Sequence, residues 1–305
     1  MQVDAGAGAK HSPGPAFVEG WVSATVWQIP CGRRTLEVGR RTLIMGILNV
    51  TPDSFSDGGR WAEPESAVAR ALEMLSEGAD IIDVGGESTR PGHLPVPAGE
   101  EMRRVLPVIR AIRTAAPDAV ISVDTQKAGV AEAALEAGAD MLNDIWGLQR
   151  DPEMARVAAR YRCPVVVMHN QEGTEYADLV GDITAFFERS LELARAAGLP
   201  QEHIILDPGV GFGKTPLQNL EVIQRLGEFR QLNRPLLLAT SRKSTIGKVL
   251  GGLPPEERLE GTAATVAIGI ANGADIVRVH DVRAMKRVAQ VADAIVRPGR
   301  GGFEG

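Results

Sequence analysis

The stretch GILNVTPDSFSDGGR, residues 46–60, decides how the chain is organised. It continues an apolar run, Thr42 to Leu48, that has the length and composition of a buried parallel strand. The run stops at Asn49, turn-forming residues follow, and the next periodic segment starts only at Pro64. Loops of this length in compact domains are usually functional or disordered. We therefore predict a mobile functional loop attached to a rigid strand.

The same plan, a buried strand with a polar residue at its carboxyl end and then a helix, recurs along the chain. The predicted strands are residues 42–50, 80–85, 119–125, 141–145, 164–169, 204–207, 235–241 and 276–280. The predicted helical segments are residues 64–77, 99–116, 127–137, 152–161, 179–197, 216–229, 244–271 and 282–296. Strict alternation of this kind implies parallel strands joined by helical crossovers.

A short sequence that occurs three times supports this division of the chain. The sequences EGAD, AGAD and NGAD each end a helical segment and lead into an apolar strand, at residues 77–80, 137–140 and 272–275. The glycine of each copy has a physical role, because glycine readily adopts the left-handed conformation that ends a helix. Eight βα units in about 250 residues are typical of a closed (β/α)8 TIM barrel. The alternative, an open doubly wound sheet, would usually carry a glycine-rich phosphate turn after its first strand, where this chain has NVTPD.

The segment before the first barrel strand predicts a β-hairpin. Alternating β-formers at residues 22–29 and 35–38 flank the turn sequence PCGRR, and the hairpin should cover one end of the barrel. Residues 1–17 are rich in Gly, Ala and Pro and lack the basic and apolar regions of a secretory signal, so we predict a disordered tail. Residues 18–305 are then a single TIM-barrel domain.

Composition excludes several classes of protein. The formal net charge is −6 and no Lys/Arg block occurs, which argues against nucleic-acid binding, so the cations that meet an anionic ligand must be gathered locally. Cys31 and Cys163 are the two cysteines and form no CxxC motif, so a disulfide framework or zinc site is not expected and a reducing, cytoplasmic location fits. No apolar stretch approaches the ~18 residues of a membrane span.

Polar side chains follow nearly every predicted strand at its carboxyl end, which is where TIM barrels carry their active sites. The acceptor-rich members of this set are Asp124, Asn143 and Asp207. The cationic members are Arg90, Lys243, Arg278 and His280. The sequence SRKS, residues 241–244, opens a helix whose free N–H groups and dipole favour an anion. The set predicts a bipolar site, with a pocket for a donor-rich heterocycle and a rim for phosphate or carboxylate.

Some of these polar residues have a purely structural alternative. Asp, Asn and Ser also cap helices, and we assign Thr125 and Asp281 to capping. His169 is a lone histidine near a strand end, which is more often structural than catalytic. Arg278 could form an ordinary ion pair at the rim, but its place on the carboxyl face of the barrel favours function. We favour function for Asp124, Asn143, Asp207 and Lys243.

Seven motifs in order along the chain resemble those of the dihydropteroate synthases, the pterin-binding enzymes of folate biosynthesis. They are MGILNVTPDSFSDGGR (45–60), DVGGESTRPG (83–92), SVDT (122–125), ND (143–144), LDPGVGFGK (206–214), SRKS (241–244) and RVH (278–280). The resemblance implies a (β/α)8 barrel, in agreement with the strand count. It also implies condensation of 6-hydroxymethyl-7,8-dihydropterin pyrophosphate with 4-aminobenzoate, which gives 7,8-dihydropteroate and pyrophosphate.

The resemblance also implies roles for individual residues. The implied pterin-binding residues are Asp124, Asn143, Asp207, Lys243, Arg278, Met168 and Phe212. The implied aminobenzoate-binding residues are Thr89, Phe55, Pro91, Phe212 and Ser244. Asp57 and Arg90 would order the closed loops, and Asn49 would be an oxygen ligand of Mg²⁺. Catalysis would fall to Asp124, Lys243, Arg278, His280 and Arg90.

The implied mechanism is early loss of pyrophosphate, after which the arylamine attacks a pterin-methyl cation. The family further suggests a homodimer and a target of sulfonamides. Three alternatives remain at this level: a pterin-binding methyltransferase with a corrinoid partner, a non-catalytic pterin-binding paralogue, and a purely structural barrel. The long TPDSFSDGG loop and SRKS argue against the first, intact Asn49, Arg90 and Lys243 argue against the second, and the convergent polar strand ends argue against the third.

Overall fold

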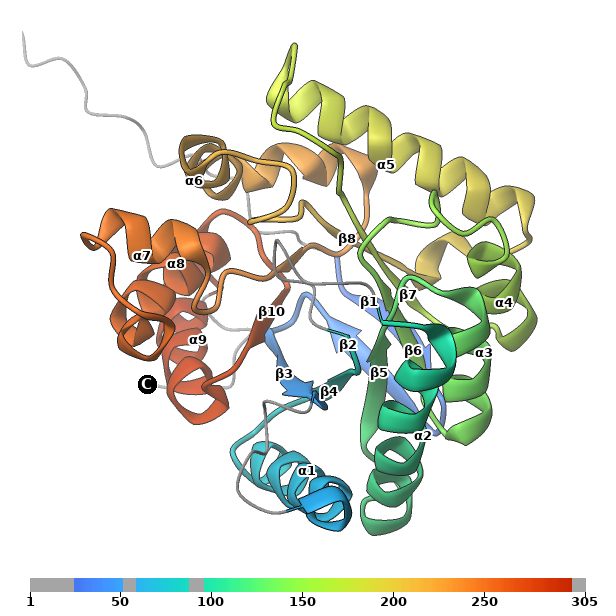
Figure 1. The fold of residues 1–305 in the computed structure, drawn as a ribbon. Coiled ribbons are helices and arrows are strands. Elements are labelled where there is room, and N and C mark those ends of the chain that lie inside the picture. The colour runs from blue at the N-terminus through green and yellow to red at the C-terminus, as the bar shows by residue number, and fades with distance from the viewer. Residues whose placement is uncertain (1–24, 52–58, 88–95, 298–305) are drawn as a thin grey trace, which may run out of the picture.

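The computed structural model of the chain describes residues 25–51, 59–87 and 96–297 and shows a ring of parallel strands surrounded by helices (Figure 1). The strands of the ring are β3 (Leu43–Asn49), β4 (Ile81–Gly85), β5 (Val120–Asp124), β6 (Met141–Asp144), β7 (Val165–Met168), β8 (Ile204–Asp207), β9 (Leu237–Leu238) and β10 (Ile276–Val279). They follow the order β8-β7-β6-β5-β4-β3-β10-β9. A parallel bridge between Leu206 and Leu236 joins the two outer strands, so the ring closes and the open doubly wound sheet is excluded.

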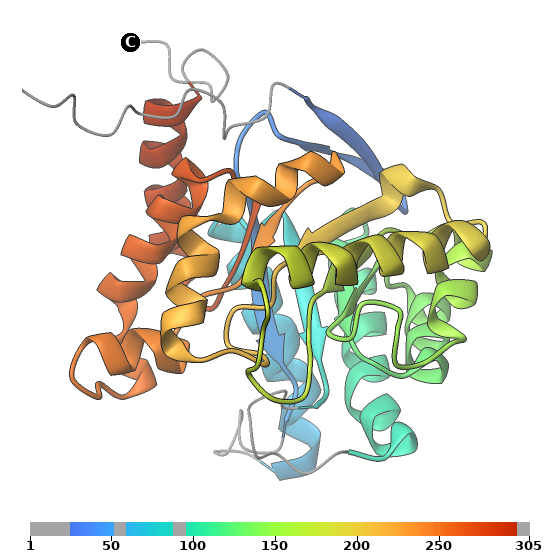
Figure 2. The same ribbon diagram turned by 90° about the horizontal axis from the view of Figure 1, so that it is seen from above.

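The helices connect successive strands on the outside of the ring (Figures 1 and 2). They are α1 (Gly59–Ser76), α2 (Ala98–Ala115), α3 (Ala128–Ala137), α4 (Met154–Tyr161), α5 (Leu179–Ala196), α6 (Pro216–Gln224), α7 (Ser244–Val249), α8 (Leu259–Ala271) and α9 (Val282–Val296). Short 3₁₀ turns span Gln201–His203, Leu226–Leu232 and Pro255–Glu257. Among the described residues no helix is long and apolar enough to cross a membrane.

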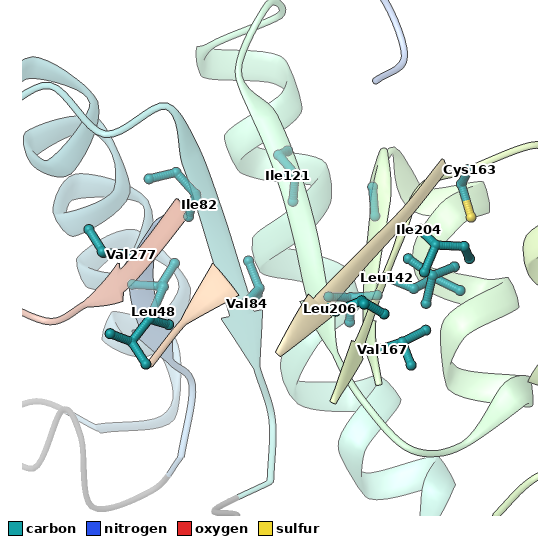
Figure 3. Close-up of a cluster of buried hydrophobic side chains, with 14 of the residues drawn as sticks. Leu48, Ile82, Val84, Ile121, Leu142, Cys163, Val167, Ile204, Leu206 and Val277 are labelled. Atoms are coloured by element: carbon teal, nitrogen blue, oxygen red, sulfur yellow. The ribbon is translucent and has the colours of Figure 1, made fainter. Parts of the chain in front are cut away.

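Two hydrophobic clusters lie on the two sides of the barrel wall, because successive side chains of a strand point to opposite faces. The outer cluster joins the wall to the helices and includes Leu48, Val84 and Ile121 (Figure 3). The inner cluster contains the residues one step away in the alternation, such as Leu43 and Val120. The predicted TIM barrel is therefore confirmed at the level of side-chain direction as well as topology.

The inner cluster also contains the N-terminal hairpin, β1 (Trp27–Cys31) and β2 (Arg34–Val38). Ile29 and Val38 of the hairpin pack against the inward side chains near the amino ends of the barrel strands, and both are fully buried. The hairpin thus covers the amino end of the barrel, as predicted, and leaves the carboxyl end for the polar strand ends (Figure 2).

Several predicted boundaries were wrong. The first helix begins at Gly59, five residues before the predicted start at Pro64. The helical region 244–271 is two helices, because Gly251 and Gly252 take left-handed φ angles of 74° and 98° and end the first helix. The helix that starts at Pro216 ends at Gln224 and continues as a 3₁₀ turn. The seventh barrel strand is two residues long, much shorter than the predicted segment 235–241.

Candidate active site

The inward side chains change from apolar to polar along several barrel strands, among them β5, β6, β8 and β10. On β5 the inward series is Val120, Ser122 and Asp124, so the last of them lies at the carboxyl end. Asn143 of β6 pairs in register with Asp124, and Met168 of β7 pairs with Asp207 of β8. The carboxyl ends of parallel strands meet at one end of a barrel, so these polar side chains share one site.

Arg278 of β10 is the centre of a buried polar network at this end. Its Nε donates to Asp83 Oδ2 at 2.6 Å, and an Nη atom donates to Asp124 Oδ2 at 2.7 Å. Asn143 Nδ2 donates to the same oxygen of Asp83 at 3.0 Å. The network links four strands, and one guanidinium holds two carboxylates close together.

Asp83 is a site residue for which we predicted no role from the sequence. It is fully buried and occupies the same inward register as Ile81 and Gly85. A period-2 reading of the strand could have placed it inside the barrel, since it lies two residues before the carboxyl-end glycine.

Three buried polar atoms near this network have no hydrogen-bond partner within the described part of the chain. They are Asp83 Oδ1, Ser122 Oγ and Asp124 Oδ1. Buried polar atoms are normally paired with protein, water or ligand. The two carboxylate oxygens can accept hydrogen bonds from a donor-rich ligand or from water that lies beneath it.

Asp124 is the titratable group with the clearest functional signature. Burial raises its pKa from 3.8 to about 7, opposed by the positive charge of Arg278 and assisted by the negative charge of Asp83. A carboxylate with a pKa near neutrality, in a cluster of charged groups, is typical of active sites.

Asp207 and Lys243 form the second charged pair. Gly209 N donates to Asp207 Oδ1 at 2.8 Å, which orients the carboxylate. Burial raises the pKa of Asp207, while the charge of Lys243 and the Gly209 hydrogen bond oppose that rise. Burial lowers the pKa of Lys243 to about 8, and the charge of Asp207 limits the shift. Arg278 also interacts electrostatically with both groups, so the acceptors and cations form one bipolar site.

Lys243 lies in the turn between β9 and α7, where it is the N-cap residue of the helix. Its Nζ donates to the carbonyl of Val210 and stands 4.7 Å from the centre of the Phe212 ring, a cation–π arrangement. Ser244 is exposed at the start of α7, with its side chain available to solvent and ligand. Phe212, Lys243 and Ser244 therefore border the site together.

Lys214 was also missed, although it ends the motif that carries Phe212. Its Nζ donates to the carbonyls of Gly209 and Phe212, both at 3.1 Å, and lies 2.9 Å from His169 Nδ1. Burial lowers the pKa of Lys214 to about 7 and that of His169 to about 3. His169 is thus a buried partner of Lys214, which agrees with its structural assignment.

The end of β10 is fixed by side chains from the neighbouring turn. Ser241 Oγ lies 2.9 Å from His280 Nδ1 and accepts from the His280 backbone N–H at 3.1 Å. Asp281 was predicted to cap the following helix, and this is wrong: it occupies the N-cap position, but its carboxylate binds the guanidinium of Arg242 at 2.5 and 2.9 Å. Thr125 was also predicted to cap a helix, and this is wrong: the N-cap residue of α3 is Lys127, no side chain caps that helix, and Thr125 Oγ1 accepts from the N–H of Lys127 at 3.3 Å.

Asn49 stands at the carboxyl end of β3, half-buried and beside Gly85. A Cβ placed on Gly85 would lie 3.7 Å from Asn49 Oδ1 and 3.8 Å from Asp124 Oδ2, so both oxygens border one small space. Within the described ranges no group of three or more His, Cys, Asp or Glu side chains is arranged to hold a metal. The Asn49 oxygen fits an Mg²⁺ ion that takes most of its other ligands from water and from a substrate phosphate.

Five predicted site residues, Phe55, Asp57, Thr89, Arg90 and Pro91, lie outside the described residues. The flanking residues are described: Asn49 and Val50 precede the first segment, and Glu87 precedes the second. The described chain therefore stops, in both cases, just after the carboxyl end of a barrel strand, β3 or β4.

Comparison with known proteins places the chain in a family. Residues 45–280 match the family model described as pterin binding enzyme. The dihydropteroate synthase of Clostridium beijerinckii is 53% identical over 267 residues, which cover 87% of this chain and 98% of the relative. That of Bacillus subtilis is 53% identical over 264 residues, with 87% and 92% covered.

The solved structures that resemble this chain include dihydropteroate synthases as well. A Clostridium difficile dihydropteroate synthase, determined in the presence of pteroic acid, has a TM-score of 0.84 and 54% identity, and the match covers 86% of this chain and 99% of the other. A Xanthomonas albilineans dihydropteroate synthase with 4-aminobenzoic acid has a TM-score of 0.85 and 40% identity, with 89% and 98% covered. Because these matches span most of the chain, it belongs to the pterin-binding enzymes and, among them, to the dihydropteroate synthase family.

Proposed function

We propose that this protein condenses 6-hydroxymethyl-7,8-dihydropterin pyrophosphate with 4-aminobenzoate and releases 7,8-dihydropteroate and pyrophosphate. The observation that carries the proposal is the bipolar site itself. Asp124, Asn143 and Asp207 offer acceptors at one end of the barrel, and Lys243 and Arg278 bring positive charge to the same end. A pterin has a row of N–H donors beside a carbonyl, and a pyrophosphate is an anion, so the substrate matches both halves.

Recognition of the pterin falls to residues on the strands and the turn after β9. Asp207, held by the Gly209 N–H, would accept from the 2-amino group and ring N–H in charge-assisted hydrogen bonds. Asn143 and Asp124 would contact the other edge, and Lys243 would turn from the Val210 carbonyl to donate to the pterin carbonyl. Met168, buried beside Asp207, would pack against the ring.

The reaction then needs a leaving group that is stabilised as its bond breaks. Arg278 and His280 lie at the end of β10, where positive charge would meet the departing pyrophosphate. The ionised Asp124 would stabilise positive charge that develops on the pterin-methyl group. The arylamine nitrogen then attacks this carbon, forms the new C–N bond and loses its proton.

Asn49 would be the protein ligand of Mg²⁺, with the remaining ligands from phosphate oxygens and water. Bound there, Mg²⁺ would neutralise charge on the pyrophosphate. Equilibrium dialysis with Mn²⁺ as a paramagnetic probe tests the site: binding should require pyrophosphate and should weaken in Asn49→Ala. Equal Mn²⁺ binding by both proteins would remove Asn49 from the ligand set.

The aminobenzoate would lie between Phe212 and the two loops that carry Phe55, Thr89 and Pro91. Its carboxylate would meet Ser244 at the first turn of α7. Asp57 and Arg90 would order these loops when they close. A Yersinia pestis dihydropteroate synthase has been solved as a sulfonamide drug complex. Sulfonamides resemble 4-aminobenzoate, so we expect them to compete with it here.

A pyrophosphate-release assay tests the function. Sustained release of pyrophosphate should require the pterin pyrophosphate, 4-aminobenzoate and Mg²⁺ together. A corrinoid-dependent methyltransferase or a non-catalytic paralogue would release no pyrophosphate, and that result would overturn the proposal.

We further propose a cytoplasmic homodimer. Large apolar side chains are exposed on the last two helices: Ile268 on α8 and Val291 and Ile295 on α9 are 53%, 63% and 70% exposed. The two helices pack against each other, so these residues could form one self-complementary face. Ile268→Glu should shift the sedimentation velocity toward that of a monomer. Both cysteines are buried thiols, which suits a reducing compartment, and cell fractionation tests the location.

A further inference from the structure

Two segments of the site contact each other across the carboxyl end of the barrel. The first is residues 208–213 after β8, and the second is residues 241–245 after β9. Lys243 donates from the second segment to the Val210 carbonyl of the first. Gly211 has a φ of 87°, and a Cβ there would lie 2.9 Å from Lys243 Cδ, so the lysine stem lies directly on this glycine.

A single side chain outside both segments ties them together. Asn219 Oδ1 accepts from Gly211 N at 2.7 Å, and Asn219 Nδ2 donates to Thr245 Oγ1 at 3.0 Å. A backbone N–H is only a donor, so the amide oxygen must face Gly211 and the amide orientation is fixed. Asn219 and Thr245 are each 3% exposed. Loss of either hydrogen bond would therefore leave a buried polar group without its partner.

Asn219 has a rigid support. It lies in the first turns of α6, where Thr215 and Gln218 form a capping box, and its own N–H donates to the Thr215 carbonyl at 3.0 Å. At the other end of the same helix, Asn272 Nδ2 donates to the Ile223 carbonyl at 2.9 Å. The helix is thus held at both ends, so Asn219 has a fixed position from which it contacts the two segments.

We propose that Asn219 is a positioning residue that sets the distance between Phe212 and Ser244, and that 4-aminobenzoate is the substrate whose binding depends on it. This inference rests on the proposed function, which places the benzene ring at Phe212 and the carboxylate at Ser244. The pterin contacts on β5, β6 and β8 are carried by strands and do not depend on the link, so Lys243 is the one pterin contact of the proposed function that lies in a linked segment, whereas Phe212 and Ser244 both lie in linked segments. Loss of the link should therefore affect one substrate more than the other.

The experiment compares steady-state kinetics of Asn219→Leu, Thr245→Val and Thr245→Ser with the unaltered protein. Asn219→Leu and Thr245→Val should raise KM for 4-aminobenzoate about tenfold, which equals about 1.4 kcal/mol and is the size expected for one unsatisfied buried group. The KM for the pterin pyrophosphate should stay within about twofold. Thr245→Ser keeps the hydroxyl and should behave as the unaltered protein. The double variant should cost no more than the worse single variant, because both remove the same link.

Asn272→Leu is the matched control, since it removes an asparagine hydrogen bond to α6 at the end far from the site. Its KM values should not change. An equal rise in both KM values, or no difference between Thr245→Val and Thr245→Ser, would overturn the inference. The serine and valine pair gives the decision even where Asn219→Leu does not fold.

Calorimetry separates this inference from the proposed function. Pteroate contains the aminobenzoate half and 6-hydroxymethylpterin does not, so Thr245→Val should weaken only pteroate binding. Unaltered protein that binds neither compound would refute the proposed function. Unaltered protein that binds both, with a Thr245→Val variant of equal pteroate affinity, would refute the role of Asn219 alone.

Discussion

Replacement of Asp83 by Asn removes one buried charge and keeps the shape of the side chain. Asp83 and Asp124 each accept a hydrogen bond from Arg278, at 2.6 and 2.7 Å, so the two carboxylates share one guanidinium. Two charges about 5 Å apart at an effective dielectric constant of about 20 interact by roughly 3 kcal/mol, or about 2 pKa units. We expect Asp83→Asn to lower the pKa of Asp124 from about 7 by about 1–2 units.

The assay is the pH dependence of kcat/KM, which reports ionisations of the free enzyme and substrate. The acidic limb should move to lower pH in Asp83→Asn and should be absent in Asp124→Asn, which identifies the titrating group. An NMR titration of the ¹³C-labelled carboxyl group gives the same pKa without turnover. An Asp124 pKa that stays near 7 or rises after the change would refute the reasoning about the shared guanidinium.

The same pKa predicts how stability varies with pH. The pKa of Asp124 is raised on folding from 3.8, so its ionisation opposes the folded state. Its contribution to the free energy of unfolding should be intact below pH 4 and should decline as pH rises through the window from about 4 to 7. Subtraction of the Asp124→Asn stability curve isolates this contribution, and a difference curve that rises with pH would contradict the assignment.

Three further substitutions test the site. Lys243→Ala should lose turnover while its circular dichroism spectrum is unchanged, and retained turnover would remove Lys243 from catalysis. Asp207→Ala should lose pterin pyrophosphate binding in calorimetry, because it removes the acceptor that the Gly209 N–H orients; unchanged affinity would count against the pterin contact. Gly211→Ala should destabilise the protein by about 1–3 kcal/mol in urea unfolding, because its φ of 87° disfavours a side chain and its Cβ would contact Lys243. Unchanged stability would show that the glycine is not required.

The barrel could be predicted from sequence because each strand carries its own signal. Apolar runs, glycine helix ends and strict alternation of strands and helices are local patterns, and their repetition selects one topology. Closure of the ring could not be read in this way. It depends on the contact of Leu206 with Leu236 across strands that are two to four residues long, which is a property of the whole assembly.

The site could be predicted only in part, because some of its residues carry no local signal in the sequence. Polar residues in the last two positions of a strand, such as Asn143 and Asp207, are visible as the point where an apolar run ends. Asp83 was not, because it lies inside its strand and only the inward period places it beside Arg278. Asp281 was misassigned because an N-cap aspartate can serve a partner from another turn, here Arg242, and sequence distance hides that partner.

The most direct test of the whole account is a crystal structure of the protein with pteroate bound. The account predicts that the pterin lies inside the carboxyl end of the barrel, with its amino group within hydrogen-bond distance of Asp207 and its aminobenzoate half between Phe212 and Ser244. Pteroate bound at the hairpin end, or outside the ring of strands, would contradict it.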